Sequence, residues 1–220
     1  MITVWGRRSS VNVQKVLWTL AELDVPFRRE AVGGSFGGNQ DSDFLAMNPN
    51  GLVPVIRDGD VTMFESNAIV RYLAARYRAG LLRPADHRAL AMAEQWMEWQ
   101  QTSFAGHVGT IFFNQVRLPP EQRNPRAAAE AVERAAAALR IADAHLSRHE
   151  WFAGTGFSFA EIVIGALLWR YLGLDCPRPE MPHVTAWFEA LQSRAGFRQW
   201  IMVPRARDPA DWNRIERELG

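Results

Sequence analysis

The chain has 220 residues, of which 48% are hydrophobic and 22% are charged, as in an ordinary soluble globular protein. A chain of this length buries roughly 70% of the surface that it exposes when unfolded, so its core needs no metal ion or disulfide bond. With 25 Lys+Arg against 24 Asp+Glu, it has no general attraction to nucleic acid or to an anionic membrane, and we expect neither as a partner.

The first 77 residues alternate between strand patterns and helix patterns. Residues 2–5 alternate apolar and polar side chains and predict a short strand. One face of a helix follows, ended by Pro26, with apolar side chains at steps of three and four: Val13, Val16, Leu17, Leu20 and Leu23. A strand at residues 27–32, a glycine-rich loop at 33–38, a helical turn at 43–47, a hairpin around Asp58-Gly59 and a helix at 65–77 complete the series. This order predicts an α/β domain over residues 1–79.

The second part of the chain carries helix patterns and no convincing strand pattern. Gly80 and Pro84 mark a linker. Long helices are predicted at about residues 86–115, 125–149, 158–172 and 182–194. Ser158 and Glu161 form a capping box that starts the third of these helices. We therefore expect an all-α C-terminal domain over residues 86–220.

The start of the first predicted helix carries no acidic side chain. Ser9, Ser10 and Asn12 stand in or next to its first turn, and Arg7 and Arg8 come just before it. Acidic residues normally suit this position, because the helix dipole leaves partial positive charge there. A turn with neutral donors and no acid suits a bound anion instead. Arg7 and Arg8 themselves are expected to be solvated surface charges.

Four stretches, in this order and spacing, resemble the cytosolic glutathione S-transferases. They are SSVNVQKVLWTL at the first helix, NPNGLVPVI before the hairpin, FESNAIVRYLA after it, and GFSFAEIVIGALLW in the C-terminal part. The segments around the first helix and the glycine-rich loop are most similar to bacterial members near the theta and beta branches. The resemblance implies a thioredoxin-like N-terminal domain followed by a helical domain, a homodimer, and glutathione as co-substrate, with no metal ion.

The resemblance also implies where glutathione binds. Val53, before a cis Pro54, would pair its backbone N–H and C=O with the cysteinyl part of the tripeptide, as an added strand. Ser66, at the N-cap of the helix after the hairpin, and Glu65 would hold the γ-glutamyl end. An ordinary helix cap is the alternative role for Ser66.

One position departs from the family pattern. Leu52 stands where many relatives have a lysine that contacts the glycyl carboxylate of glutathione. Gln40 or Asn39, in the loop after the second strand, would then compensate for the missing lysine. Weak affinity for glutathione is a possible consequence of this departure.

Thiolate chemistry gives the acid-free turn its role. The thiolate of glutathione is the nucleophile, and a cysteine-like thiol has a pKa of about 8.5. Lowering that pKa by two units takes about 2.7 kcal/mol, whereas one hydrogen bond to an ion gives about 1.5–3 kcal/mol and the dipole adds about 0.3–1 kcal/mol. Ser10 matches the serine of theta-like enzymes, and Asn12 and Ser9 are the other candidate donors. For Ser10 and Asn12, capping the helix is the alternative role.

The electrophile is expected between the two domains, against the long helix after the linker. That segment offers an apolar pocket whose candidate residues are Trp99, Phe104, His107, Phe113 and Arg117. His107 is the only group among them that titrates near neutral pH. For any one aromatic side chain on this helix, packing in the core is the alternative.

The main interpretation is a glutathione transferase that adds the thiolate to a small hydrophobic electrophile, with or without loss of halide, in detoxification. A thiol oxidoreductase needs a cysteine at the start of the first helix, and residues 9–12 contain none. A non-catalytic module that binds glutathione or a protein is the other alternative. The single Cys176 excludes an internal disulfide framework, and the sequence shows no signal peptide and no run of 18 apolar residues, which together predict a cytoplasmic protein.

Overall fold

The computed structural model describes residues 1–78, 80–154 and 156–220. Four short strands form one sheet in the N-terminal part: β1 (Ile2–Trp5), β2 (Phe27–Glu30), β3 (Val55–Asp58) and β4 (Val61–Phe64). Their order across the sheet is β2-β1-β3-β4, with β1 parallel to β2, β1 antiparallel to β3, and β3 antiparallel to β4. β2 ends at Glu30 rather than at the predicted residue 32. Beyond that point the chain still bonds to the loop after β1, from Arg7 N to Val32 O at 3.0 Å, outside regular strand geometry.

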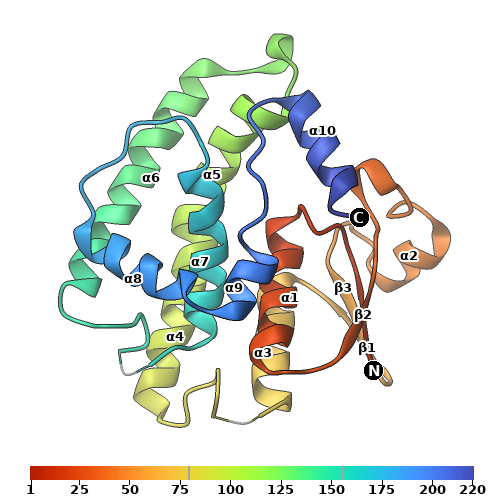
Figure 1. Cartoon of the computed structure of the whole chain (residues 1–220), viewed down its shortest axis with the longest axis horizontal. Helices are drawn as coiled ribbons and strands as arrows, with labels where there is room; N and C mark the ends of the chain where they lie inside the picture. The colour runs from red at the N-terminus through yellow and green to blue at the C-terminus, as the bar shows by residue number, and fades with distance from the viewer. Residues whose placement is uncertain (79, 155) are drawn as a thin grey trace.

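Three helices and one short turn accompany the sheet. They are α1 (Val11–Glu22), η1 (Gly34–Phe36), α2 (Ser42–Met47) and α3 (Ser66–Arg76). α1 and α3 pack side by side between the sheet and the helical part of the chain, and α2 lies on the far side of the sheet (Figure 1). This is the α/β domain that the sequence patterns predict, in the thioredoxin-like arrangement that the resemblance implies.

The second part of the described chain is built from helices. Its elements are α4 (His87–Trp99), η2 (Gln100–Phe104), α5 (Ala105–Phe112), η3 (Phe113–Arg117), η4 (Pro120–Gln122), α6 (Pro125–Leu146), α7 (Phe159–Leu172), α8 (Pro182–Gln192), α9 (Ala195–Trp200) and α10 (Pro209–Glu218). The long helix predicted at 86–115 is a run of α4, η2, α5 and η3, in which η2 and η3 are π-helical turns. Such wider turns are frequent at functional sites. The sequence patterns did not predict α9 and α10.

α7 is the central helix of the second part, and its predicted capping box is present. Ala160 N donates to Ser158 Oγ at 3.2 Å, and Ser158 N donates to Glu161 Oε2 at 2.8 Å. Glu161 also accepts from the backbone N–H of Phe152 at 2.7 Å, and burial raises the pKa of this carboxyl group. The box therefore fixes both the start of α7 and the turn before it.

α1 belongs to both parts of the hydrophobic core. Its residues 13–20 are all buried, because α3 packs on it from the N-terminal part while α7 and α9 pack on it from the helical part. The predicted N-terminal unit ends at residue 79, which lies outside the described residues. Of the helices in the described ranges, none is long and apolar enough to span a bilayer.

Candidate functional site

Three connecting segments meet at one edge of the sheet. β1 and β3 are antiparallel and pair Trp5 with Val55, and Val55 also pairs with Phe64 of β4. The segment after β1, the segment before β3 and the segment after β4 therefore lie side by side. They carry, in that order, the candidate thiolate donors, Val53 and Ser66.

The peptide bond between Val53 and Pro54 is cis, as the resemblance implies. In the described chain the N–H and C=O groups of Val53 make no hydrogen bond, although the residue is only partly exposed. A Cβ added at Gly6 would lie 3.3 Å from Val53 Cβ, so the loop after β1 passes directly beside Val53. Free backbone groups in this position suit pairing with an extended peptide.

Ser10 occupies the N-cap of α1, and its hydroxyl makes no capping hydrogen bond. The first turn of α1 contains no acidic residue, and Asn12 is exposed on it. Helix capping, the alternative role for Ser10, is therefore not realised. Its hydroxyl is free to donate to a ligand that binds at the start of the helix.

Ser9 differs from its neighbour. It is 1% exposed, and its hydroxyl donates to Oε1 of Glu216 in α10 at 2.7 Å. Its backbone oxygen accepts from Arg170 of α7, also at 2.7 Å. Ser9 therefore joins the start of α1 to the helical part of the chain, and its hydroxyl proton is already used.

The start of α3 differs by one residue from the prediction. Glu65, not Ser66, stands at the N-cap position, and Ser66 is the first helical residue. Glu65 has a left-handed backbone conformation with φ of 68°, which for a non-glycine residue costs about 1–3 kcal/mol and is typical of binding sites. Neither the Glu65 side chain nor any other group caps the helix there through a side-chain hydrogen bond. The first N–H groups of α3 therefore have no side-chain partner and are suited to bind an anion.

Lys15, the only lysine of the chain, links α1 to α3 and to the long helical run. Its Nζ donates to Oδ1 of Asn67 at 3.1 Å and to Oε1 of Gln100 at 3.4 Å, and the residue is 1% exposed. Burial lowers the pKa of Lys15 to about 7, while the charge of Glu65 acts in the opposite direction. The Nε2 of Gln100 is buried without a partner in the described chain, so this polar cluster keeps an unused donor.

A cavity of about 250 Å³ opens beside the first turn of α1, between the two parts of the chain. Its wall is formed by α1, η2, α5, η3, α7 and α10 together with the loop before α1. Five of the predicted site residues line it: Ser9, Ser10, Asn12, Phe113 and Arg117. The structure thus brings the candidate thiolate donors together with part of the predicted electrophile pocket.

The other three pocket candidates do not line this cavity. Phe104 has no exposed surface and packs against Tyr171, and Trp99 stacks on Phe104 with ring centroids 5.8 Å apart. Phe104 therefore has the core role that was the alternative, and Trp99 is partly buried against the same core. His107 lies near Arg134 of α6, and burial together with that charge lowers its pKa. In the described residues, no group of three or more His, Cys, Asp and Glu side chains is placed to hold a metal ion.

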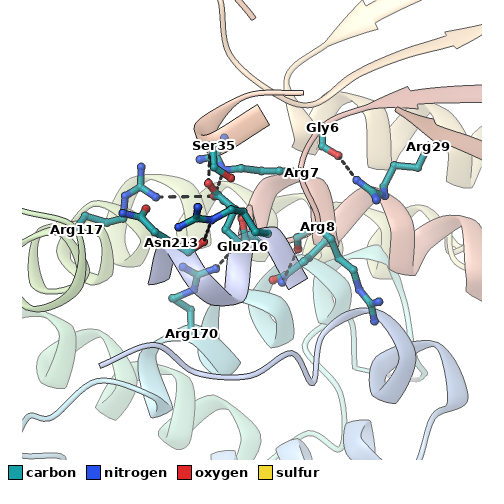
Figure 2. A network of polar contacts seen from close by, with 12 residues as sticks. Gly6, Arg7, Arg8, Arg29, Ser35, Arg117, Arg170, Asn213 and Glu216 are labelled. Carbon is teal, nitrogen blue, oxygen red and sulfur yellow. Dashed lines mark hydrogen bonds and ion pairs between the residues drawn. The ribbon is translucent and has the colours of Figure 1, made fainter. Parts of the chain in front are cut away.

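Arg7 is part of the site and not the solvated surface charge that the sequence predicts. Its Nε lies 2.8 Å from Oε1 of Glu216, with side-chain exposures of 21% and 1%. Oε2 of Glu216 accepts from Ser35 N at 2.7 Å, and Nη1 of Arg117 lies 3.9 Å from Oε1 (Figure 2). Burial acts to raise the pKa of Glu216, but the hydrogen bonds from Ser35 and Ser9 and the charge of Arg7 lower it.

Arg8 also differs from the expectation of a solvated charge. Its guanidinium lies over the ring of Trp200, 5.0 Å from the centroid, and donates to the backbone oxygen of Gln199. Burial lowers its pKa. Figure 2 shows that it points away from Glu216, so of the two arginines only Arg7 joins the site.

The loop beside Leu52 gives the two compensating candidates different surroundings. Leu52 itself is 64% exposed. Asn39 Nδ2 donates to the backbone oxygen of Gly51 at 2.8 Å, so this amide holds the turn before Leu52. Gln40 is exposed and lies against the same turn, where a Cβ added at Gly51 would be 2.3 Å from its Nε2. Of the two amides, Gln40 is the one free to meet a carboxylate.

Five residues of the site are absent from the predicted set: Arg7, Lys15, Arg170, Trp212 and Glu216. The sequence could have pointed to Lys15, because it is the only lysine of the chain and falls within the apolar stretch of α1. It could also have pointed to α10, because Asp208 caps it and Pro209 follows at the first helical position. No local sequence pattern marks Arg170 or Glu216. Both contact Ser9, which lies 161 and 207 residues from them along the chain.

Comparisons with known proteins agree with this geometry. Residues 1–75 match the family described as glutathione S-transferase, N-terminal domain, and residues 110–195 match glutathione S-transferase, C-terminal domain. The chain is 41% identical to glutathione S-transferase GstB of Escherichia coli K12 over 207 residues, which cover 93% of this chain and 99% of that protein. It is 34% identical over 208 residues to glutathione S-transferase 3 of Zea mays, covering 91% of this chain and 93% of that protein. A theta class glutathione S-transferase from Xanthomonas axonopodis pv. citri, solved with glutathione bound, aligns with a TM-score of 0.89 at 38% identity, covering 93% of this chain and 99% of that one.

Proposed function

The chain belongs to the glutathione S-transferase family, and from this premise we propose that the start of α1 holds the thiol of glutathione as a thiolate. The protein is a glutathione transferase with a thioredoxin-like half and a helical half. We assign glutathione binding to residues 1–79 and the electrophile site to residues 86–220. The observation that carries the proposal is the uncapped hydroxyl of Ser10, at an acid-free helix start that faces a cavity.

Ser10 is the donor that the geometry favours. The hydroxyl of Ser9 is engaged by Glu216, whereas Asn12 lines the cavity and is a second candidate. A hydroxyl bonded to an ion contributes about 1.5–3 kcal/mol and the helix dipole about 0.3–1 kcal/mol, which together lower a thiol pKa by one to three units at about 1.4 kcal/mol per unit. The thiol proton leaves to water, and the sulfur keeps its electron pair.

The remainder of glutathione is assigned along the edge of the sheet. The unpaired N–H and C=O of Val53, held by the cis Pro54, take the cysteinyl part as an added strand. The γ-glutamyl carboxylate lies at the start of α3 by Ser66, and its ammonium faces Glu65. Gln40 meets the glycyl carboxylate, while Asn39 holds the turn behind it.

The electrophile is assigned to the cavity between α1 and the helical half. Phe112, Phe113 and Trp212 supply an aromatic wall for a small hydrophobic molecule. The thiolate sulfur forms a bond to the electrophilic carbon with its own electron pair. Where that carbon carries a halide, the carbon–halide bond breaks and the halide leaves with the bonding pair.

A titration of bound glutathione tests this proposal. The ultraviolet absorbance of the thiolate is followed from pH 5 to 10 in the wild type and in Ser10→Ala, with free glutathione as the reference. We expect the thiolate to form well below pH 8 in the wild type and nearer its free value in the variant. Binding without thiolate formation would leave a non-catalytic glutathione-binding module, the alternative that the exposed Leu52 favours, and failure to bind immobilised glutathione would exclude both.

Assembly and location extend the same proposal. We infer a homodimer across the two halves and a cytoplasmic, detoxifying role, since these follow from the family resemblance of the sequence. Analytical ultracentrifugation of the purified chain at micromolar concentration tests the dimer. A single species at the mass of one chain, 24.9 kDa, would contradict it.

A further inference from the structure

The wall of the cavity carries an excess of positive charge. Its described lining residues include Arg7, Lys15, Arg117 and Arg170, and they include no aspartate or glutamate. The three arginines come from the loop after β1, from the end of η3 and from α7, so distant parts of the chain converge here. A purely hydrophobic electrophile would bring no negative charge to this wall, where Arg170 has no acidic partner among the described residues and Arg117 has only a distant one.

One carboxylate stands behind this wall, on α10. Glu216 lies 2.8 Å from Arg7 but 3.9 Å from Arg117, so it pairs closely with the first arginine only. The carboxylate of Glu216 also accepts hydrogen bonds from Ser9 Oγ and Ser35 N. Figure 2 shows the guanidinium groups of Arg7 and Arg117 approaching Glu216 from two separate segments. A single negative charge therefore serves a cluster with three arginines.

Arg170 has no acidic partner in the described chain. It donates to the backbone oxygen of Ser9 at 2.7 Å and lies over the rings of Phe112 and Trp212, 4.4 and 5.0 Å from their centroids. Burial, with the neighbouring arginine charges, lowers its pKa to about 10, so it stays protonated at neutral pH in surroundings that disfavour its charge. An anion bound in the cavity would stabilise the buried positive charge of Arg170.

We propose that the electrophile taken by this cavity carries a carboxylate, which binds against Arg117 and Arg170 while its reacting carbon lies near Ser10. The inference rests on the proposed function and names the class of its second substrate. The planar fork of arginine matches a carboxylate with two parallel hydrogen bonds. Glutathione does not supply this anion, because its own carboxylates are assigned to the start of α3 and to the loop at Gln40.

The chemistry is unchanged by the added anion. The thiolate sulfur bonds to the electrophilic carbon, and a leaving group departs with the electron pair of the bond that breaks. The carboxylate takes no part in bond making. It sets the orientation of the electrophile, so its effect falls on kcat/KM through binding and positioning.

Two probes that differ in charge and share their reacting carbon test the proposal. They are 4-chloro-3,5-dinitrobenzoate and 4-chloro-3,5-dinitrobenzamide, and each kcat/KM is divided by the uncatalysed rate with glutathione. We expect the carboxylate to be preferred by at least about tenfold, the effect of one hydrogen bond to a charged group. The preference should weaken as salt is raised, because salt screens the charges.

Substitutions test whether Arg117 produces the preference for the carboxylate probe. Arg117→Gln should lower the preference for the carboxylate several-fold, with Arg170 keeping the remainder, and Arg117→Lys should restore part of the loss. Arg126→Gln is the matched control, because Arg126 is 90% exposed on α6 and pairs only with Glu130 in the described chain. The control should keep the full preference.

Other results would overturn the proposal. Equal rates for the two probes would do so, as would an Arg117→Gln variant that slows both probes by the same factor or that raises KM for glutathione alone. Conjugation of the amide without preference for the carboxylate would sink this inference and leave the transferase proposal standing. Absence of thiolate and of conjugation with either probe would sink both.

Discussion

The Nζ of Lys15 lies 3.1 Å from Oδ1 of Asn67, so the only lysine of the chain ties α1 to the first turn of α3. The two helix starts assigned to the thiolate and to the γ-glutamyl end of glutathione are held together through this contact. Lys15 is buried, and its pKa of about 7 lies below the ordinary value of 10.5. The charge of Lys15 in this contact therefore changes near physiological pH.

Stability should depend on pH through Lys15. Below pH 7 the folded and unfolded chains are both protonated there, and folding bears the full penalty of burying the charge. Between about 7 and 10.5 the unfolded chain binds more protons than the folded chain, so this penalty falls as pH rises. Compared with Lys15→Met, the wild type should gain stability from pH 7 to 10 in urea unfolding. A difference between the two proteins that is constant over this range would contradict the assignment.

Removing the Ser10 hydroxyl should weaken the thiolate. In Ser10→Ala the loss of one hydrogen bond to an ion, about 1.5–3 kcal/mol, should raise the pKa of bound glutathione by one to two units and lower kcat at neutral pH about 10- to 100-fold. The thiolate titration and steady-state rates measure the two effects. Ser9→Ala is the comparison, and it should act mainly on stability because its hydroxyl bonds Glu216. A Ser9 variant with the larger pKa effect would reverse the assignment.

Glu216→Gln should destabilise the protein at neutral pH by about 1.5–3 kcal/mol, because it removes the charge that pairs with Arg7. The pKa of Glu216 is lowered, so its contribution is present at neutral pH and is lost as the pH falls through that lowered value. The difference from the wild type should therefore shrink in acid. Glu218→Gln is the control on the same helix, and it should change stability little because its pair with Arg214 is exposed to solvent.

Two glycine-to-alanine substitutions should change the free energy of unfolding in opposite directions. A Cβ at Gly165 would lie 2.6 Å from Leu191 Cδ1 and 3.3 Å from the Trp18 ring, so Gly165→Ala should lower the free energy of unfolding by about 1–3 kcal/mol. Gly106 is exposed in α5 with nothing within 4 Å of its Cβ position, so Gly106→Ala should raise stability by about 0.5–1 kcal/mol. Thermal unfolding followed by circular dichroism measures both. A neutral Gly165→Ala would show that α7 packs less closely against α8 and α1 than described.

Restoring a cation at position 52 should strengthen glutathione binding. Leu52 is 64% exposed, so Leu52→Lys leaves the core intact and places an ammonium beside the assigned glycyl carboxylate. A surface ion pair of about 0.2–1 kcal/mol corresponds to a Kd about 1.5- to 5-fold lower, which isothermal titration calorimetry resolves. Leu81→Lys makes the same change at another exposed leucine and should leave the Kd as it was. Equal effects from both variants would indicate a general charge effect.

The architecture could be predicted where local patterns decide it. Period-two and period-3.6 hydrophobicity, Asp58-Gly59 and the Ser158–Glu161 box placed most strands and helices within a few residues. The interruptions at η2 and η3 were missed, because a π-helical turn leaves the apolar spacing of a long helix almost unchanged. α10 was missed although Asp208 and Pro209 mark its start, because its sequence is strongly polar and only Trp212 and Ile215 of its apolar face are buried.

In the candidate site too, residues marked by a local pattern could be predicted, and residues that depend on distant contacts could not. Ser10 could be predicted, because a helix start is a local feature. Arg7, Arg170 and Glu216 could not, because their roles come from side chains brought together from the two ends of the chain. Phe104 shows the converse, since an aromatic on a helix facing the cavity side can turn fully into the core.

The contacts of Glu216 also limit how this enzyme can recombine with its relatives. A chimera that joins residues 1–78 to the helical half of another family member would leave Arg7, Ser9 and the Ser35 amide facing whatever that donor carries in place of Glu216. Only donors with an acid there would rebuild the entrance to α1. Substitutions on the last helix and in the first ten residues are therefore expected to be inherited together.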